Sequence, residues 1–264
     1  MATILEEITA RKRHDLTLLK EQYPVRKLYR RVEKMMDNEV HYSLPKALLK
    51  SKTGIIAEFK RKSPSLGWIH EDARPEDIVT QYANNGATAL SILTDEPYFG
   101  GQSKDLSAIR ELVNIPILRK DFTVDEYQLF EAKTLGADAI LLIAACLDKN
   151  ECRQLTNIAR ELNLDVLLEI HEERELDYLT DHVSVVGVNN RNLHLFKTDL
   201  TTSFRLSTFI PEAFVKISES GLKKAEDIRL LRAAGYNGFL IGGRLMKTED
   251  PAVALDQLIK ELES

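Results

Sequence analysis

The chain has 264 residues, of which 44% are hydrophobic, and its formal net charge is −5. This length suits one large domain or two small ones with a substantial core, and the acidic balance argues against non-specific binding to nucleic acid or an anionic membrane. Two cysteines, Cys146 and Cys152, are too few for a disulfide framework. No apolar stretch approaches the roughly 20 residues of a membrane span, and the N-terminus lacks the apolar core of a signal peptide. We therefore expect a cytoplasmic protein.

Residues 1–50 are predicted to form two or three helices. The stretch TILEEI has the pattern of a capping box, with Thr3 and Glu6 in the reciprocal positions, and KLYRRVEKMM has amphipathic spacing. A basic helix on a membrane surface is the alternative, but acidic residues interleave with the Lys and Arg of this segment. We expect solvated helices that pack on the rest of the chain.

Eight short apolar runs follow. Continuous apolar runs of this length are typical of parallel strands buried on both faces. The runs are GIIAEF (54–59), TALSIL (88–93), IPIL (115–118), DAILLI (138–143), DVLLEI (165–170), VSVVGV (183–188), AFVKI (213–217) and NGFLIG (237–242).

Segments with helical spacing lie between these runs. Residues 74–87, 123–137 and 222–236 each combine a helix-start signal or helical spacing with a glycine at the end, just before the next strand. The alternation predicts an α/β protein with a (β/α)8 TIM barrel over residues 51–264. Residues 1–50 are expected to be extra helices packed on the barrel within a single domain. A doubly wound sheet is the alternative, and the positions of the polar residues favour the barrel.

Polar or charged residues stand at the C-terminal edge of most of the runs. In a barrel these edges lie on one face, where active sites are built. Glu58 and Lys60 are two residues apart, so their side chains share a face and would converge on the mouth of the barrel. The edge residues are Glu58, Lys60, Thr94, Asp95, Lys120, Glu169, Asn189 and Ser218 through Ser220.

Glycines follow the last two predicted strands, in SESGL (218–222) and IGGRLM (241–246). Glycine lets backbone N–H groups approach an anion closely, and the loops after strands seven and eight are the usual phosphate site of a (β/α)8 barrel. The sequence therefore predicts a phosphate-binding site at these two loops.

The residue types at the predicted mouth favour proton-transfer chemistry. Lysine can serve as a general acid; burial lowers its pKa, whereas a nearby glutamate raises it and can itself act as a base. His70, His171, His182 and His194 are scattered without metal-ligand spacing and are interpreted as surface or structural residues. Cys146 is a candidate nucleophile, but no histidine lies in motif with it. We expect neither a metal nor a cofactor.

The strand-end motifs resemble those of the indole-3-glycerol phosphate synthase family, from about residue 50 to residue 247. The motifs that carry the resemblance are IIAEFKRKSPSLG, LSILTDEPYFGG, PILRKDF, LLEIH, VGVNNRNL, SESGL and LIGGRLM. The resemblance implies a (β/α)8 barrel of tryptophan biosynthesis, a carboxy-lyase. Its substrate would be 1-(2-carboxyphenylamino)-1-deoxyribulose 5-phosphate, converted by ring closure with loss of CO₂ and water.

The resemblance also implies roles for individual residues. Lys120 would be the general acid and Glu169 its acid/base partner, with Glu58 and Lys60 acting in ring closure, carboxylate binding and dehydration. Polar groups that orient the substrate would be Asn189, Ser220 and Arg191. Phosphate-binding positions would be Ser63, Gly221, Gly242 and Gly243, and apolar walls around the aromatic ring would be Phe99 and Phe122.

Two other functions compete with this interpretation. One is another phosphate-sugar barrel enzyme, such as a phosphoribosylanthranilate isomerase, although that chemistry needs only one acid and one base. The other is a non-catalytic protein that holds RNA through KRK (60–62), which a net-acidic chain supports poorly. We expect a small phosphorylated substrate, no nucleic acid or membrane partner, and a monomer or weak oligomer. Contact with other enzymes of tryptophan synthesis is a further expectation from the resemblance.

Overall fold

A closed barrel of eight parallel strands forms the centre of the computed structural model, which describes residues 3–36, 40–192 and 197–264. Around the barrel the strand order is β1, β12, β11, β8, β7, β6, β5, β4, so neighbours in sequence pair in space. The predicted (β/α)8 architecture is confirmed. The strands are β1 (Ile55–Phe59), β4 (Ala89–Leu93), β5 (Ile117–Lys120), β6 (Ala139–Ile143), β7 (Asp165–Ile170), β8 (Val185–Asn189), β11 (Val215–Glu219) and β12 (Gly238–Ile241).

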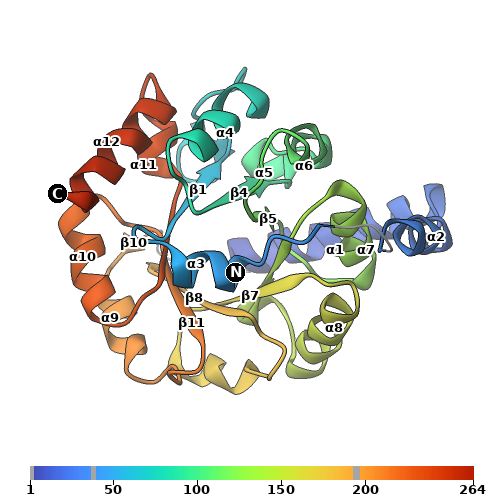
Figure 1. The fold of residues 1–264 in the computed structure, drawn as a ribbon. Helices are drawn as coiled ribbons and strands as arrows, with labels where there is room; N and C mark the ends of the chain where they lie inside the picture. Colours follow the sequence, from blue (N-terminus) through green and yellow to red (C-terminus); the bar gives the residue numbers. More distant parts are fainter. Residues whose placement is uncertain (1–2, 37–39, 193–196) are drawn as a thin grey trace.

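Helices surround the strands as an outer ring (Figure 1). Each predicted helical segment contains one helix, and α7 ends at Gly136, whose φ of 87° is the left-handed conformation that favours glycine. The helices are α4 (Pro75–Asn84), α5 (Glu96–Phe99), α6 (Ser103–Arg110), α7 (Glu126–Leu135), α8 (Lys149–Glu161), α9 (Thr201–Ser207), α10 (Ala225–Ala233), α11 (Gly243–Met246) and α12 (Pro251–Glu263), with the 3₁₀ helices η1 (Ala144–Cys146) and η2 (Glu173–Tyr178).

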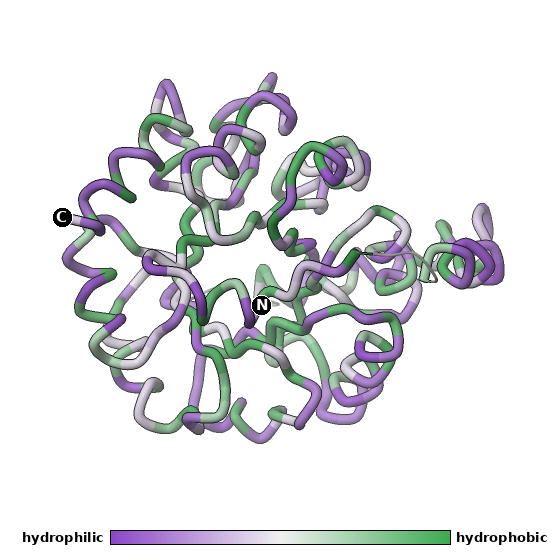
Figure 2. The backbone as a smooth tube through the Cα atoms, viewed as in Figure 1, coloured by the Kyte–Doolittle hydropathy of each residue, from purple (hydrophilic) through white to green (hydrophobic). Residues whose placement is uncertain are grey.

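Two apolar layers hold the fold together. One lies between the strands and the outer helices, and the other fills the barrel interior. Hydrophilic residues concentrate on the outer turns of the helices (Figure 2). The N-terminal end of the barrel is closed by α3 (Leu44–Lys50), which lies over its centre in Figure 1 and inserts the fully buried Leu44 and Leu48 into the interior layer.

The first helix, α1 (Ile4–Gln22), crosses the opposite end of the barrel. The predicted capping box is present: Thr3 and Glu6 exchange side-chain to backbone hydrogen bonds of 2.7 and 3.1 Å. Leu5 joins the interior apolar layer, and Lys12 forms ion pairs with Asp95 at 2.9 Å and Asp121 at 2.8 Å. The next helix, α2 (Val25–Met36), packs on α7 at the rim. Among the described helices, none is long and apolar enough to span a membrane.

The segment after β1 forms a small antiparallel hairpin, β2 (Lys62–Ser63) and β3 (Gly67–Trp68), in which Gly67 adopts a φ of 66° and lets the chain reverse. A second short hairpin, β9 (Arg191–Asn192) and β10 (Lys197–Thr198), follows β8.

Candidate active site

A cavity of about 630 Å³ opens at the C-terminal ends of the strands. Every residue to which the family resemblance assigns a role lines it, whereas the edge residues Thr94, Asp95 and Ser218 do not. The lining residues with such a role are Glu58, Lys60, Ser63, Phe99, Lys120, Phe122, Glu169, Asn189, Arg191, Ser220, Gly221, Gly242 and Gly243. The strand ends carry most of them, since alternate residues of a strand point inward and the last inward residue stands at the mouth.

Lys120, at the end of β5, is the centre of the polar cluster. Its Nζ lies 2.5 Å from Oε2 of Glu219 and 3.3 Å from Oε2 of Glu169. The other oxygen of Glu169, Oε1, accepts a hydrogen bond of 3.1 Å from Asn189 Nδ2. Asn189 in turn accepts from the backbone N–H of Arg191 at 3.0 Å, which fixes its amide orientation. One lysine therefore links three strands across the barrel.

The charges of this cluster set its protonation. Burial alone would lower the pKa of Lys120, but Glu219 and Glu169 raise it above its usual value, so the lysine is a cation. Burial, with Glu169 nearby, raises the pKa of Glu219 to about 7, although Lys120 opposes this. The pKa of Glu169 is lowered: burial opposes ionisation, but Lys120 and His171 outweigh it. The cluster thus holds a cationic lysine, an ionised Glu169 and a Glu219 that can exchange a proton near neutral pH.

The sequence places Glu219 at a strand edge, within Ser218 through Ser220, but predicts no catalytic role for it. Strand β11 extends through Glu219, so Val215, Ile217 and Glu219 alternate onto the inward face. Its Oε1 occupies the space where a Cβ on Gly187 of β8 would stand. A strand prediction two residues longer would have placed this carboxylate inside the barrel.

Glu58 and Lys60 meet at the mouth as their spacing predicts. Glu58, on β1, is buried and pairs with Lys60 Nζ. A Cβ on Gly242 would overlap Oε1 of the same glutamate. Gly242, expected only at the phosphate, therefore also provides the space that Glu58 fills.

The phosphate-binding residues of the prediction gather at one side of the cavity. Ser220 and Gly221 both have positive φ, 67° and 81°, a strained backbone for serine that turns the chain sharply after β11. Gly243 begins α11 with open space at its Cβ position, and the buried Ser63 Oγ has no hydrogen-bond partner among the described residues. Arg191 reaches across to Ser65 of the β2–β3 hairpin with a hydrogen bond of 2.9 Å.

Apolar side chains form the other wall. The rings of Phe99 and Phe122 lie 6.1 Å apart at a tilt of 37°, and Ile4, Leu5 and Ile8 of α1 line the same cavity. A flat aromatic group fits such a wall, and water is excluded from its faces.

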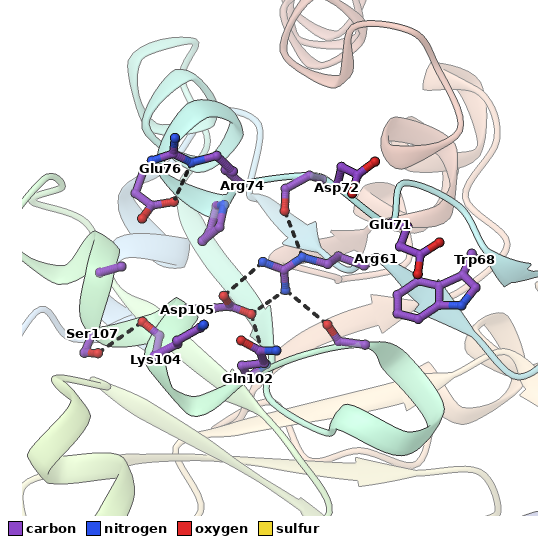
Figure 3. Close-up of a pocket in the computed structure, with 14 residues that line it drawn as sticks. Arg61, Trp68, Glu71, Asp72, Arg74, Glu76, Gln102, Lys104, Asp105 and Ser107 are labelled. Carbon is purple, nitrogen blue, oxygen red and sulfur yellow. Dashed lines mark hydrogen bonds and ion pairs between the residues drawn. The ribbon is translucent and has the colours of Figure 1, made fainter.

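A second cleft, of about 620 Å³, lies outside the barrel beside the base of the β2–β3 hairpin (Figure 3). Its central residue, Arg61, is fully engaged: it pairs with Asp105 through both terminal nitrogens at 2.5 and 3.0 Å. It also donates to the carbonyl oxygens of Ala73 and Gly100. We interpret Arg61 as an anchor for the hairpin rather than a ligand-binding cation.

The structure also bears on the sequence interpretation of His171 and Cys146. Of the two alternatives given for His171, surface or structural, the structure excludes an exposed surface position: the side chain is 16% exposed and its ring lies 3.5 Å from Glu169. Burial raises the pKa of the Cys146 thiol to about 12, which argues against a nucleophile. His194 lies outside the described residues. Within the described part of the chain no three His, Cys, Asp or Glu side chains are arranged to hold a metal ion.

Lysines and carboxylates at the C-terminal ends of the strands, together with glycine loops after β11 and β12, are the arrangement typical of a (β/α)8-barrel enzyme. Solved structures of similar fold include 3-hexulose-6-phosphate synthase, with a TM-score of 0.61 and 14% identity over 79% of this chain and 99% of that one. Another is thiamine phosphate pyrophosphorylase from Pyrococcus furiosus, with a TM-score of 0.59 and 16% identity over 81% of this chain and 98% of that one. At these identities the likeness concerns the fold alone.

Sequence comparison is more specific. The family model of indole-3-glycerol phosphate synthase matches residues 5–258. The chain is 48% identical to the indole-3-glycerol phosphate synthase of Bacteroides thetaiotaomicron over 263 residues, all of both chains. It is 41% identical to that of Carboxydothermus hydrogenoformans, over 97% of this chain and 99% of the relative. The chain belongs to the indole-3-glycerol phosphate synthase family.

Proposed function

We propose that the cavity converts 1-(2-carboxyphenylamino)-1-deoxyribulose 5-phosphate into indole-3-glycerol phosphate, CO₂ and water. The observation that carries the proposal is Lys120, a largely buried cation between Glu169 and Glu219 at the barrel mouth. Membership of the family and the phosphate-type loops support the same reaction. The substrate has an anionic benzoate and a phosphate at opposite ends, and the cavity offers a polar and an apolar side to match.

The first step is carbon–carbon bond formation. Lys120 donates a proton to the ketone oxygen while the ring carbon that bears the carboxylate attacks the carbonyl carbon. Phe99 and Phe122 hold the aromatic ring of the substrate against the cavity wall. This contact orients the attacking ring carbon toward the carbonyl carbon, which lowers the entropic cost of bond formation. Ser63, Gly221 and Gly243 bind the phosphate, and Arg191 with Lys60 faces the substrate anions.

Decarboxylation follows, because loss of CO₂ returns an electron pair to the ring and restores aromaticity. Dehydration then removes the new hydroxyl group with a proton, and a base takes a proton from the neighbouring carbon to form the indole double bond. Glu169, whose pKa is lowered, is ionised and suits the base, while the Lys60–Glu58 pair suits delivery of a proton to the hydroxyl. Starting from the ionised carboxylate, one proton from solvent is consumed per turnover, and Glu219 is placed to return it to Lys120.

The test is turnover of this substrate by the purified protein without added metal or cofactor, followed by indole fluorescence. Phosphoribosylanthranilate serves as the competing substrate and should not be isomerised. Lys120→Ala should lower kcat by about 10² to 10⁴-fold because a general acid is lost. The exposed Lys104 provides the matched control, Lys104→Ala. A Lys120→Ala protein that retains more than about a tenth of the wild-type kcat would contradict the assignment.

Cytoplasmic location, a monomeric or weakly associated state and contact with other enzymes of tryptophan synthesis remain predictions. Family membership supports a phosphorylated small molecule as the substrate.

A further inference from the structure

The imidazole of His171 lies between two carboxylates just beyond the end of β7. Its Nε2 is 3.5 Å from Oε1 of Glu169, and its Nδ1 is 3.9 Å from Oε2 of Glu175. The side chain is only 16% exposed, and both ring nitrogens are buried. Among the described residues neither nitrogen has a partner in hydrogen-bonding geometry. A buried polar atom without a hydrogen-bond partner destabilises a folded protein, so the position of this ring needs an explanation.

Glu175 is fixed in place by the backbone. Its Oε2 accepts from the N–H groups of His171 at 2.5 Å and Glu172 at 3.1 Å, which caps the start of η2. This carboxylate therefore cannot move away from the ring without breaking the cap. A neutral imidazole offers a proton to only one of its two carboxylate neighbours, whereas an imidazolium offers one to each.

The two oxygens of Glu169 have different surroundings. Oε2 faces Lys120 at 3.3 Å, on the side where the substrate would lie, whereas Oε1 faces Asn189 at 3.1 Å and His171 at 3.5 Å. When Lys120 gives its proton to the substrate, Glu169 loses its nearest cation while it must still be an ionised base. The groups next to Oε1 then determine whether the carboxylate of Glu169 stays ionised and directed at the substrate. Asn189 is an uncharged amide. The thiol of Cys146, which is affected by the charge of Glu169, is neutral because burial raises its pKa to about 12.

We propose that His171 is a positioning residue for Glu169: its Nε2 faces Oε1 and donates to it once Lys120 has given up its proton, so that Oε2 stays ionised and directed at the substrate. The proposal rests on the proposed role of Glu169 as the base. Glu175 completes the arrangement by holding the far side of the ring, in the way that a third group orients the base in a catalytic triad. The charges facing the ring are thus Glu169 on β7 and Glu175 on η2, with Lys120 on β5 behind Glu169.

The electrostatics of Glu169 agree with this geometry. Burial raises the pKa of its carboxyl group, and Lys120 followed by His171 lowers it, with a net lowering. Removing His171 should raise that pKa. Because the base must be ionised, activity falls as pH falls through its pKa, so the acid limb of the rate profile should move to higher pH.

The experiment compares single-turnover rates of His171→Ala and His171→Gln over a range of pH. His171→Ala should lower the rate by about 10 to 100-fold, as expected for a misplaced catalytic group, with KM little changed and the acid limb moved to higher pH. His171→Gln should recover most of the rate, because an amide N–H can still donate to Oε1. Glu175→Gln keeps an oxygen for the η2 cap and should move the acid limb in the same direction by a smaller amount.

His182→Ala is the matched control, since His182 contacts Arg160 and lies away from the cavity. A His171→Ala protein with wild-type rate and acid limb would overturn the proposal. The proposal would also be overturned if His171→Ala and His171→Gln lost equal amounts of rate, with lowered thermal stability and an unchanged acid limb. Such a result would indicate that His171 has only a packing role. Glu169→Gln separates the proposed role of Glu169 from that of His171. If Glu169→Gln retains wild-type activity, the proposed role of Glu169 as the base is wrong. If Glu169→Gln is inactive while His171→Ala behaves like wild type, only the His171 proposal is wrong.

Discussion

At the scale of single residues, the site depends on charges that the fold keeps out of water. Glu169 and Glu219 are buried, the side chain of Lys120 is only 12% exposed, and this one cation faces two carboxylates. Two like charges at one site cannot both ionise freely, so one carboxyl group holds its proton to higher pH. In this cluster it is Glu219, whose pKa burial raises to about 7.

Replacing Glu219 should therefore change how stability depends on pH. A carboxyl group whose folded pKa lies above its unfolded value stabilises the fold at low pH, and that contribution is lost as pH rises through about 7. Glu219→Gln, which cannot ionise, should be more stable than wild type at pH 8, by up to about 3 kcal/mol, and should show little gain near pH 4. Urea unfolding at several pH values measures the difference. The exposed Glu212→Gln is the control, and a Glu219→Gln difference that does not change with pH would contradict the shifted pKa.

Two glycines should prove important because of the carboxylates that fill their side-chain space. In Gly187→Ala the new methyl group would displace Glu219 from Lys120, so we expect a lower kcat and an overpacking cost of about 1–3 kcal/mol. The double variant Gly187→Ala with Glu219→Ala should lose less than the sum of the single losses, since both act on one contact. Additive losses measured in that cycle would show that Gly187 acts elsewhere.

Gly242→Val should change phosphate binding and the position of Glu58 together. It should raise KM and weaken inhibition by inorganic phosphate, and it should also lower kcat because valine would push Glu58 aside. Gly243→Ala keeps its N–H and meets no atom within 4 Å, so its effect on kcat should be much smaller. Steady-state kinetics with phosphate as inhibitor measure both. Unchanged phosphate inhibition in Gly242→Val would count against the phosphate site.

At the scale of elements, the strands were predictable because each is a buried apolar run, but their ends were not. The run IPIL predicts a strand ending at residue 118, whereas β5 continues to Lys120. Arg119 stays in the sheet because Glu131 at 2.6 Å and Asp121 at 3.2 Å neutralise it, and such partners cannot be identified from local sequence. The roles of Glu219 and His171 could not be predicted for the same reason, because they depend on neighbours on other strands and on η2.

The β2–β3 hairpin is the element that we expect to move. Its tip, residues 64–68, is exposed, and its base is fixed by Arg61 and by a hydrogen bond of 2.9 Å from Lys62 to the carbonyl of Pro97. Little buried surface offsets the backbone entropy of the tip, so it should exchange amide hydrogens fast when the site is empty. Substrate anions would draw Lys60 and Ser63 inward and close the hairpin over the cavity.

Hydrogen exchange on residues 60–68, with and without the product, tests this closure. We expect protection only with the ligand. Leu66→Pro removes the hydrogen bond of 3.2 Å from the Leu66 N–H to the carbonyl oxygen of Ser63, so it alters the tip and should change kcat and KM together. Equally slow exchange in the two states would show a static hairpin.

At the scale of the whole molecule, helices from the first fifty residues close both ends of the barrel. One end receives Leu44 and Leu48 of α3, while α1 lies across the mouth and contributes Leu5 and Ile8 to the cavity wall. The sequence predicts these helices and their packing on the barrel, but not that α1 completes the site. The tie that holds α1 there is Lys12, whose side chain is 15% exposed and pairs with the buried Asp95 and Asp121.

Lys12→Met should therefore affect stability and substrate binding together. Removing one member of a buried ion pair leaves uncompensated charge, which costs about 3–5 kcal/mol, although Arg119 still pairs with Asp121 at 3.2 Å and moderates the loss. Because α1 would sit less firmly over the mouth, KM should rise by a larger factor than kcat falls. The matched control is Lys20→Met: Lys20 also joins α1 to the barrel, pairing with Asp125 at 2.6 Å, but it is 38% exposed. An exposed pair contributes at most about 1 kcal/mol. Urea unfolding and steady-state kinetics of the two variants give the comparison, and equal behaviour would show that α1 is held by its apolar face alone.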